Sequence, residues 1–293
     1  MSYTLNTGYP SRQIYIQSGD ADHIIDGIGD RVYYFSEILH VPTHITMLMS
    51  IVDAQIPMSY YAINTTNYTL NYTESGADKT YQLTAGNTDA ITLKNDLTTN
   101  LDNITCTYST ITNKFTFTDS SGDFTFKASS TALKLLGFTP DTAHTSSSSV
   151  LTSDNCVDLS GTKAIYLQTQ LGNYNIDSRT GQNTSVLTKI PVDTGGNGIL
   201  KYTNKTNYKS AITAKHIGHL HIQLEDDNRN IIDFNGVNYS ITFQLDFIET
   251  IPYKHYNKDF QMLEATNFSD IIPRPKPRGR PKGSKNKPKE EMN

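Results

Sequence analysis

The chain has 293 residues, of which 36% are hydrophobic and only 18% charged, so much of its polarity comes from uncharged Thr, Ser, Asn and Gln. With 18 Tyr and no Trp, this composition favours β-structure, because Thr and Tyr prefer strands while Asn and Gly prefer turns. No apolar run approaches the ~20 residues of a membrane span, and no secretion signal is recognisable, which argues against an integral membrane or secreted protein and favours a reducing compartment.

The first part of the chain predicts an N-terminal arm followed by strands. Residues 1–12 show no pattern. Strands are predicted over 13–18, 31–37 and 43–61. In the last of these, the apolar run from Ile45 to Val52 is typical of a strand buried on both faces, and Pro57 indicates a bend or an edge position. A short buried helix is the alternative for this run, and the flanking prolines disfavour it.

From about Thr65 the pattern becomes that of a small α+β unit. In chain order it predicts a hairpin over 67–73 and 80–84, a helix over 87–101, short strands over 104–108, 114–118 and 123–127, and a short helix over 130–136. Thr88 or Asp89 can cap the first helix, and Gly137 can end the second. The serine run 146–149 indicates a linker. We therefore predict an inserted α+β domain over residues 64–149.

Strand patterns resume after this unit, over 163–171, 185–192 and 199–203. In 163–171 the apolar residues do not keep one register, which predicts a β-bulge. The segment 211–249 alternates most strictly, in two arms joined by a polar connection that contains Asn235-Gly236. One face of the first arm carries Leu220, Ile222 and Leu224, and one face of the second carries Tyr239, Ile241, Phe243, Leu245 and Phe247. This pattern predicts a hairpin whose apolar face needs a second sheet to cover it.

These elements predict a mainly β protein. About eight short strands, antiparallel by their spacing, indicate a single jelly-roll sandwich formed by residues 13–63 and 150–250, with the α+β domain inserted between the two blocks. Residues 251–272 have weaker order and form a C-terminal extension. No period of 20–50 residues repeats, which argues against a solenoid or a propeller.

Signals of catalysis are absent from the sequence. It contains no GxSxG, HExxH, Walker or GxGxxG motif, so we expect no enzyme, no catalytic residue and no cofactor. Cys106 and Cys156 are too few and too isolated for a disulfide framework or a metal knuckle.

Three groups of titratable residues could be interpreted as metal sites. His216, His219 and His221 are the densest cluster, and the last two share the polar face of a strand at a spacing that some zinc sites use. A solvated or subunit-facing strand is the more ordinary alternative, and we predict no metal site. Two groups of acids are explained by loops and turns, since their spacing does not match a calcium loop. They are Asp20, Asp22, Asp26 and Asp30, and Glu225, Asp226 and Asp227.

Residues 273–293 form a basic tail. It carries a net charge of +6, eight basic residues against two Glu, which leaves −10 on the rest of a chain whose total is −4. Repeated proline and charge predict that it is disordered. Its centre, Arg278-Gly279-Arg280-Pro281, resembles an AT-hook, in which arginines enter a narrow minor groove. The predicted nucleic-acid-binding residues are Lys276, Arg278, Gly279, Arg280, Pro281, Lys282, Lys285, Lys287 and Lys289. A localisation signal, or a solvated tail without a role, are the alternatives.

Two stretches of the body resemble the penton (minor capsid) proteins of virophages and polinton-like viruses. They are the inserted unit, with YQLTAGNTDAITLKNDLTTNL and ITCTYSTITNKFTFTDSSGDFTFKASSTALKLLGF, and the later HLHIQLEDDNRNIIDFNGVNYSITFQLDF. The resemblance covers roughly residues 13–250 and consists of strand and turn residues, without a catalytic signature. It does not extend to the tail.

The resemblance implies a single jelly roll that forms homopentamers at the fivefold vertices of an icosahedral double-stranded DNA virus, beside the major capsid protein. The insertion would project outward between two strands. The protein would reside in the virion and, during assembly, in the host cytoplasm or nucleus. DNA is a further possible partner, through the tail.

Two other functions stay open at this point. One is a receptor-binding or fibre-type jelly roll with the insertion as its ligand-binding head; such heads are usually trimers, whereas a vertex must be a pentamer. The other is a sandwich-fold enzyme, such as a carbohydrate-active one, which the lack of an acid pair in a defined groove disfavours.

Overall fold

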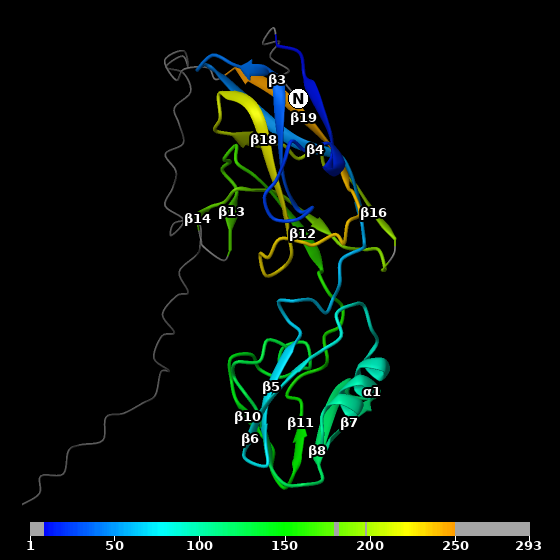
Figure 1. Ribbon diagram of the computed structural model, residues 1–293. Coiled ribbons are helices and arrows are strands. Elements are labelled where there is room, and N and C mark those ends of the chain that lie inside the picture. The colour runs from blue at the N-terminus through cyan, green and yellow to red at the C-terminus, as the bar shows by residue number, and fades with distance from the viewer. Residues whose placement is uncertain (1–8, 179–181, 197, 250–293) are drawn as a thin grey trace, which may run out of the picture. The chain divides into compact units, whose positions relative to one another are not determined.

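The computed structural model describes residues 9–178, 182–196 and 198–249 (Figure 1). Most of the predicted N-terminal arm, the extension 251–272 and the basic tail 273–293 lie outside the described residues, so their organisation stays a prediction. None of the helices in the described part of the chain has the length and hydrophobicity that a bilayer span requires.

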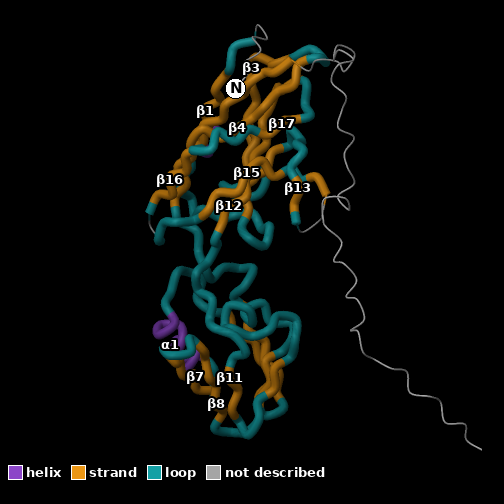
Figure 2. Tube along the Cα trace, turned by 180° about the vertical axis from the view of Figure 1, so that it is seen from behind, coloured by secondary structure: helices purple, strands orange, loops and turns teal. Residues whose placement is uncertain are grey.

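Two antiparallel sheets hold most of the long strands (Figure 2). The first, in spatial order, contains β1 (Arg12–Gln17), β19 (Ser240–Glu249), β4 (Ile45–Pro57) and β16 (Ile199–Thr203), and β17 (Ser210–Ile212) also pairs with β4. The second contains β15 (Val186–Pro191), β12 (Ala164–Thr169), β18 (His216–Glu225), β3 (Asp30–His40) and β2 (His23–Ile24). A short 3₁₀ turn, η1 (Ser18–Asp20), and a small ladder of β13 (Ile176–Asp177) with β14 (Gln182–Asn183) complete this part.

The pairing of these strands is nested. Counted along the chain, the first long strand pairs with the last (β1 with β19), the second with the seventh (β3 with β18), the third with the sixth (β4 with β16 and β17), and the fourth with the fifth (β12 with β15). This order, distributed over two facing sheets, is that of a jelly roll. The predicted fold class, a mainly β jelly-roll sandwich, is confirmed.

The inward faces of the two sheets form one hydrophobic cluster. Alternation along β18 and β19 places their apolar residues inside as predicted: Leu220, Ile222 and Leu224 are fully buried, and so is Phe243. The central strand β4 adds Met47, Met49 and Ile56, and Pro57 ends the strand rather than interrupting it. The predicted bulge is confirmed in the ladder of β12 with β15, between Leu167 and Gln168.

The predicted hairpin over 211–249 is wrong. Its arms, β18 and β19, belong to different sheets and face each other across the core. The connection over 226–239 crosses between the sheets and buries Ile232 and Phe234 on the way. Two alternating strands satisfy their apolar faces equally well by packing face to face as by pairing side by side, so the pattern alone could not separate the two arrangements.

A second hydrophobic cluster, separate from the first, lies in the segment between β4 and β12. Its sheets have the orders β10-β9-β5-β6 and β11-β8-β7. The elements are β5 (Thr69–Glu74), β6 (Ala77–Gln82), α1 (Ala90–Asn100), β7 (Ile104–Ser109), β8 (Lys114–Asp119), β9 (Phe124–Phe126), β10 (His144–Thr145) and β11 (Val150–Thr152). Because β11 pairs with β8, this unit continues past residue 149, where the sequence predicts the sandwich to resume. The domain limits themselves stay a prediction.

Local chemistry explains the ends of α1 and of the hairpin before it. Asp89 is the N-cap, since its side chain accepts a hydrogen bond from the Thr92 N–H at 2.7 Å. The turn between β5 and β6 needs positive φ at Ser75 (49°) and Gly76 (78°), as a two-residue hairpin turn does.

Two predictions for this unit are corrected. The helix predicted over 130–136 is replaced by consecutive hydrogen-bonded turns over 131–137. The backbone bonds there are irregular, since the N–H groups of Leu136, Gly137 and Phe138 bond four, three and five residues back, so the repeating i to i−4 ladder of an α-helix does not form. Gly137 still ends the segment, at φ +86°. The serine run is a tight turn, not a free linker: the hydroxyl of the buried Ser146 donates to Asp123, which also accepts the Ser149 N–H.

Separate clusters predict separate unfolding. Phe117 is fully buried in the second cluster and its ring lies 4.8 Å from that of Phe126. We expect Phe117→Ala to lower the stability of this unit by about 3–5 kcal/mol through the cavity it leaves. Calorimetry should show one transition moving to lower temperature while the sandwich transition stays in place. Phe243→Ala, in the sandwich core, is the matched control and should move the other transition; a single shared shift would contradict the prediction.

Candidate functional site

The predicted nucleic-acid-binding residues all lie outside the described residues. They are Lys276, Arg278, Gly279, Arg280, Pro281, Lys282, Lys285, Lys287 and Lys289. The AT-hook-like site therefore stays a prediction. Four features of the described residues are candidates for a site: the histidines of β18, the acids before and at the start of β3, a partly buried polar cluster, and a shallow cavity.

The histidines of β18 do not converge on one point. The His221 Nε2 lies 2.5 Å from a carboxylate oxygen of Asp30, a residue of β3 whose side chain is only 4% exposed. His219 instead packs against Tyr34, whose ring also contacts His23, at centroid distances of 5.7 and 5.6 Å. Among the described residues, no group of three or more His, Cys, Asp or Glu is placed to hold a metal ion.

Two of the four acids over residues 20–30 have structural partners. Asp22 accepts a hydrogen bond from the Tyr34 N–H at 2.6 Å, which fixes the loop against β3. Asp30 accepts from Gln223 at 3.1 Å in addition to its contact with His221. Asp20 and Asp26 are exposed, as the sequence predicts for loop acids.

A partly buried polar cluster at the end of β18 is a feature that the sequence did not predict. The guanidinium of Arg229 lies 3.9 Å from the ring centroid of Tyr166, forms an ion pair with Asp177, and lies 3.6 Å from the carboxylate of Glu225. Burial raises the pKa of Glu225, and hydrogen bonding by Gln168 and the charge of Arg229 oppose that shift. Glu225 is thus a paired residue of the strand end rather than one more solvated turn acid.

The raised pKa gives Glu225 a testable signature. The folded protein holds the proton of Glu225 more tightly than the unfolded chain does, so this group favours folding at low pH and loses that contribution as pH rises through the folded pKa. The unfolding free energy of the wild type, minus that of Glu225→Gln, should fall as pH rises above about 4.5, the ordinary glutamate value, and then level off. Urea unfolding at a series of pH values measures it. Glu37→Gln, at an exposed position, is the control; a difference independent of pH for Glu225→Gln would contradict the assignment.

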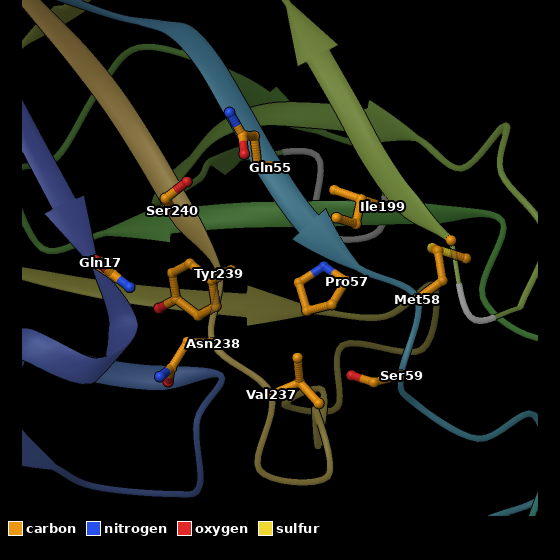
Figure 3. A pocket seen from close by; sticks show the side chains of 11 residues that line it. Gln17, Gln55, Pro57, Met58, Ser59, Ile199, Val237, Asn238, Tyr239 and Ser240 are labelled. Carbon is orange, nitrogen blue, oxygen red and sulfur yellow. The ribbon is translucent and has the colours of Figure 1, made fainter.

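A shallow cavity of about 450 Å³ opens at one end of the first sheet (Figure 3). Its polar lining is a cross-strand row on β1, β19 and β4, formed by Gln17, Ser240 and Gln55. Its apolar lining includes Pro57 and Ile199. Among the described lining residues none carries a carboxylate, so the cavity does not present the acid pair that glycoside hydrolysis uses. Its chemistry is that of amides, hydroxyls and aliphatic carbon.

Comparisons with known proteins add a likeness to solved structures. No family model and no curated protein sequence matches the chain. A solved structure that it resembles is the penton protein of mavirus, with 8% sequence identity, a TM-score of 0.43, and coverage of 82% of this chain and 100% of that one. A likeness at this identity and TM-score assigns neither family nor function. The nested strand pairing described above stands independently of it.

Proposed function

We propose that the chain is a structural capsid protein that forms pentameric vertices of an icosahedral double-stranded DNA virus. The observation that carries the proposal is a single jelly roll interrupted between its third and fourth strands, β4 and β12, by a unit with a hydrophobic core of its own. The sequence resemblance to penton proteins covers both parts. The histidines of β18 have structural partners in Asp30 and Tyr34, as a structural role would require.

The two ends of the inserted segment, where the chain leaves the sandwich and where it returns, are close in space. A Cβ built on Gly161 would lie 3.3 Å from the Cβ of Ala62, so the chain leaves the sandwich and returns to it at one place. This arrangement lets a second unit be added to a sandwich without disturbing its strand pairing. Within the proposal, the sandwich provides contacts to sister subunits and to the major capsid protein, and the interrupting unit projects from the vertex.

Subunit number tests the proposal. Native mass spectrometry of the purified protein should give a pentamer, and a chain that ends at Ile272 should give the same number, because the charged tail cannot join a dry interface. A trimer would contradict the vertex and favour the second candidate, a receptor-binding head. One observation favours that candidate: Ile111, between β7 and β8, is 93% exposed. A monomer in the truncated chain alone would show that the tail sets assembly.

The tail is proposed to hold the genome. Eight basic residues could release up to about seven counterions from B-DNA, which sets the upper limit of the salt dependence. Replacing Arg278 and Arg280 with Ala should abolish preference for A·T-rich over G·C-rich duplex, because minor-groove arginines read the narrow groove. Replacing Lys285, Lys287 and Lys289 is the matched control and should weaken binding to both duplexes equally. Titration of the full-length protein at two salt concentrations measures this; no A·T preference in the wild type would leave only a nonspecific arm or a localisation signal.

A further inference from the structure

One side of the sandwich carries an acidic surface formed by residues 18–29, the acidic segment. It contains Asp20, Asp22 and Asp26, all exposed, and neither Lys nor Arg. Two large apolar side chains lie among these acids, Ile24 at 63% and Ile25 at 62% exposure. Adjacent isoleucines that are exposed to solvent are typical of surfaces that bind another protein.

Residues 199–209, the lysine segment, carry positive charge instead. Lys201 and Lys205 are exposed, Lys209 is half-buried, and the segment contains neither Asp nor Glu. In this segment too apolar groups are exposed, with Ile199 at 55% and Tyr208 at 48%. Both segments therefore combine exposed apolar side chains with charged ones, and the charges are negative in the acidic segment and positive in the lysine segment.

The two segments border opposite sides of the sandwich. The acidic segment contains β2, which is the edge strand of the second sheet and pairs with β3. Strands β1 and β3 border the same side, since residues of both line one small cavity between the sheets. The lysine segment contains β16, which lies at the edge of the first sheet opposite β1. Near that edge an isolated bridge joins Asn173, in the segment after β12, to Ile212 of β17.

A closed ring of identical subunits needs this kind of arrangement. In cyclic assemblies other than dimers, a patch on one side of each subunit contacts a different patch on the other side of the next. Opposite charges on the two patches favour the head-to-tail contact and oppose contacts between like sides. The isoleucines and Tyr208 add the apolar area that a stable interface requires.

We propose that the acidic segment of one subunit docks on the lysine segment of the next, and that this contact closes the ring. The inference rests on the proposed pentamer and deepens it, because it names the surfaces and their partner, a second copy of this chain. Asp20 and Asp26 face Lys201 and Lys205 across the contact, and Ile24, Ile25 and Ile199 lie between them.

Reciprocal charge reversal tests the contact. Asp20, Asp26, Lys201 and Lys205 are suitable positions because they are exposed, whereas Asp22 binds the Tyr34 N–H and Lys209 forms an ion pair with Asp246 at 2.8 Å. The double variants are Asp20→Lys with Asp26→Lys, and Lys201→Glu with Lys205→Glu. Each places like charges opposite each other and should raise the concentration of half-assembly by roughly tenfold or more.

Combining all four substitutions should restore assembly, because the charges are then exchanged but complementary. The matched control is Lys94→Glu with Lys134→Glu, two lysines of the second hydrophobic unit, which should leave the subunit number unchanged. Native mass spectrometry and sedimentation over a range of salt concentrations give the readout, and added salt should weaken the wild-type ring. Circular dichroism checks that each variant is folded. If one double variant does not fold, the other double variant and the salt dependence of the wild type still test the contact.

The outcomes separate the two proposals. A wild-type pentamer that both double variants preserve, or that the fourfold variant does not recover, overturns the assigned contact and leaves the vertex function standing. A wild-type monomer or trimer overturns the vertex function and the ring contact together. Loss of assembly in the Lys94/Lys134 control would show that general surface charge, and not this pairing, governs association, and would also overturn the inference.

Discussion

The ladder between β19 and β4 is the contact on which the sandwich depends. It runs from Ser240 opposite Gln55 to Glu249 opposite Ile45, with one irregularity after Thr242. On its inner face it carries Phe243, Leu245, Met47 and Met49, all essentially inaccessible to water. Since β19 also holds β1 and β4 also holds β16 and β17, loss of this one ladder would divide the first sheet into two halves, neither able to cover the second.

The second sheet contains more buried polar side chains with partners than the ladder of β19 with β4 does. Asp30 and Glu225 are nearly buried on β3 and β18, and a buried carboxylate must be paired or it destabilises the fold. His221 and Arg229 provide the partners. Gln170 extends the ladder past the end of β12, since its side chain donates to the His219 carbonyl and accepts from the His221 N–H, both at 2.8 Å. Side chains thus complete hydrogen bonding where the backbone of the neighbouring strand ends.

Patterns confined to a few residues predicted most of this structure. Alternation in β18 and β19, the Asp89 cap and the bulge after Leu167 depend on near neighbours, and all are present. Contacts between distant residues were not predictable in this way: the assignment of β18 and β19 to different sheets, and the meeting of Arg229 with Tyr166 and Asp177. The turns over 131–137 were likewise not predictable from the local sequence, since β5, which is distant along the chain, binds this segment through the Ala132 N–H.

The nested pairing has a consequence for the order in which the chain folds. The sandwich needs β1 and β19, which stand at its two ends in sequence, so it cannot close before residue 249 has left the ribosome. The second cluster draws only on a contiguous stretch between β4 and β12, and we expect it to form first during synthesis. Once formed, it holds Ala62 and Gly161 together and removes most of the loop whose closure would otherwise slow the pairing of the sandwich.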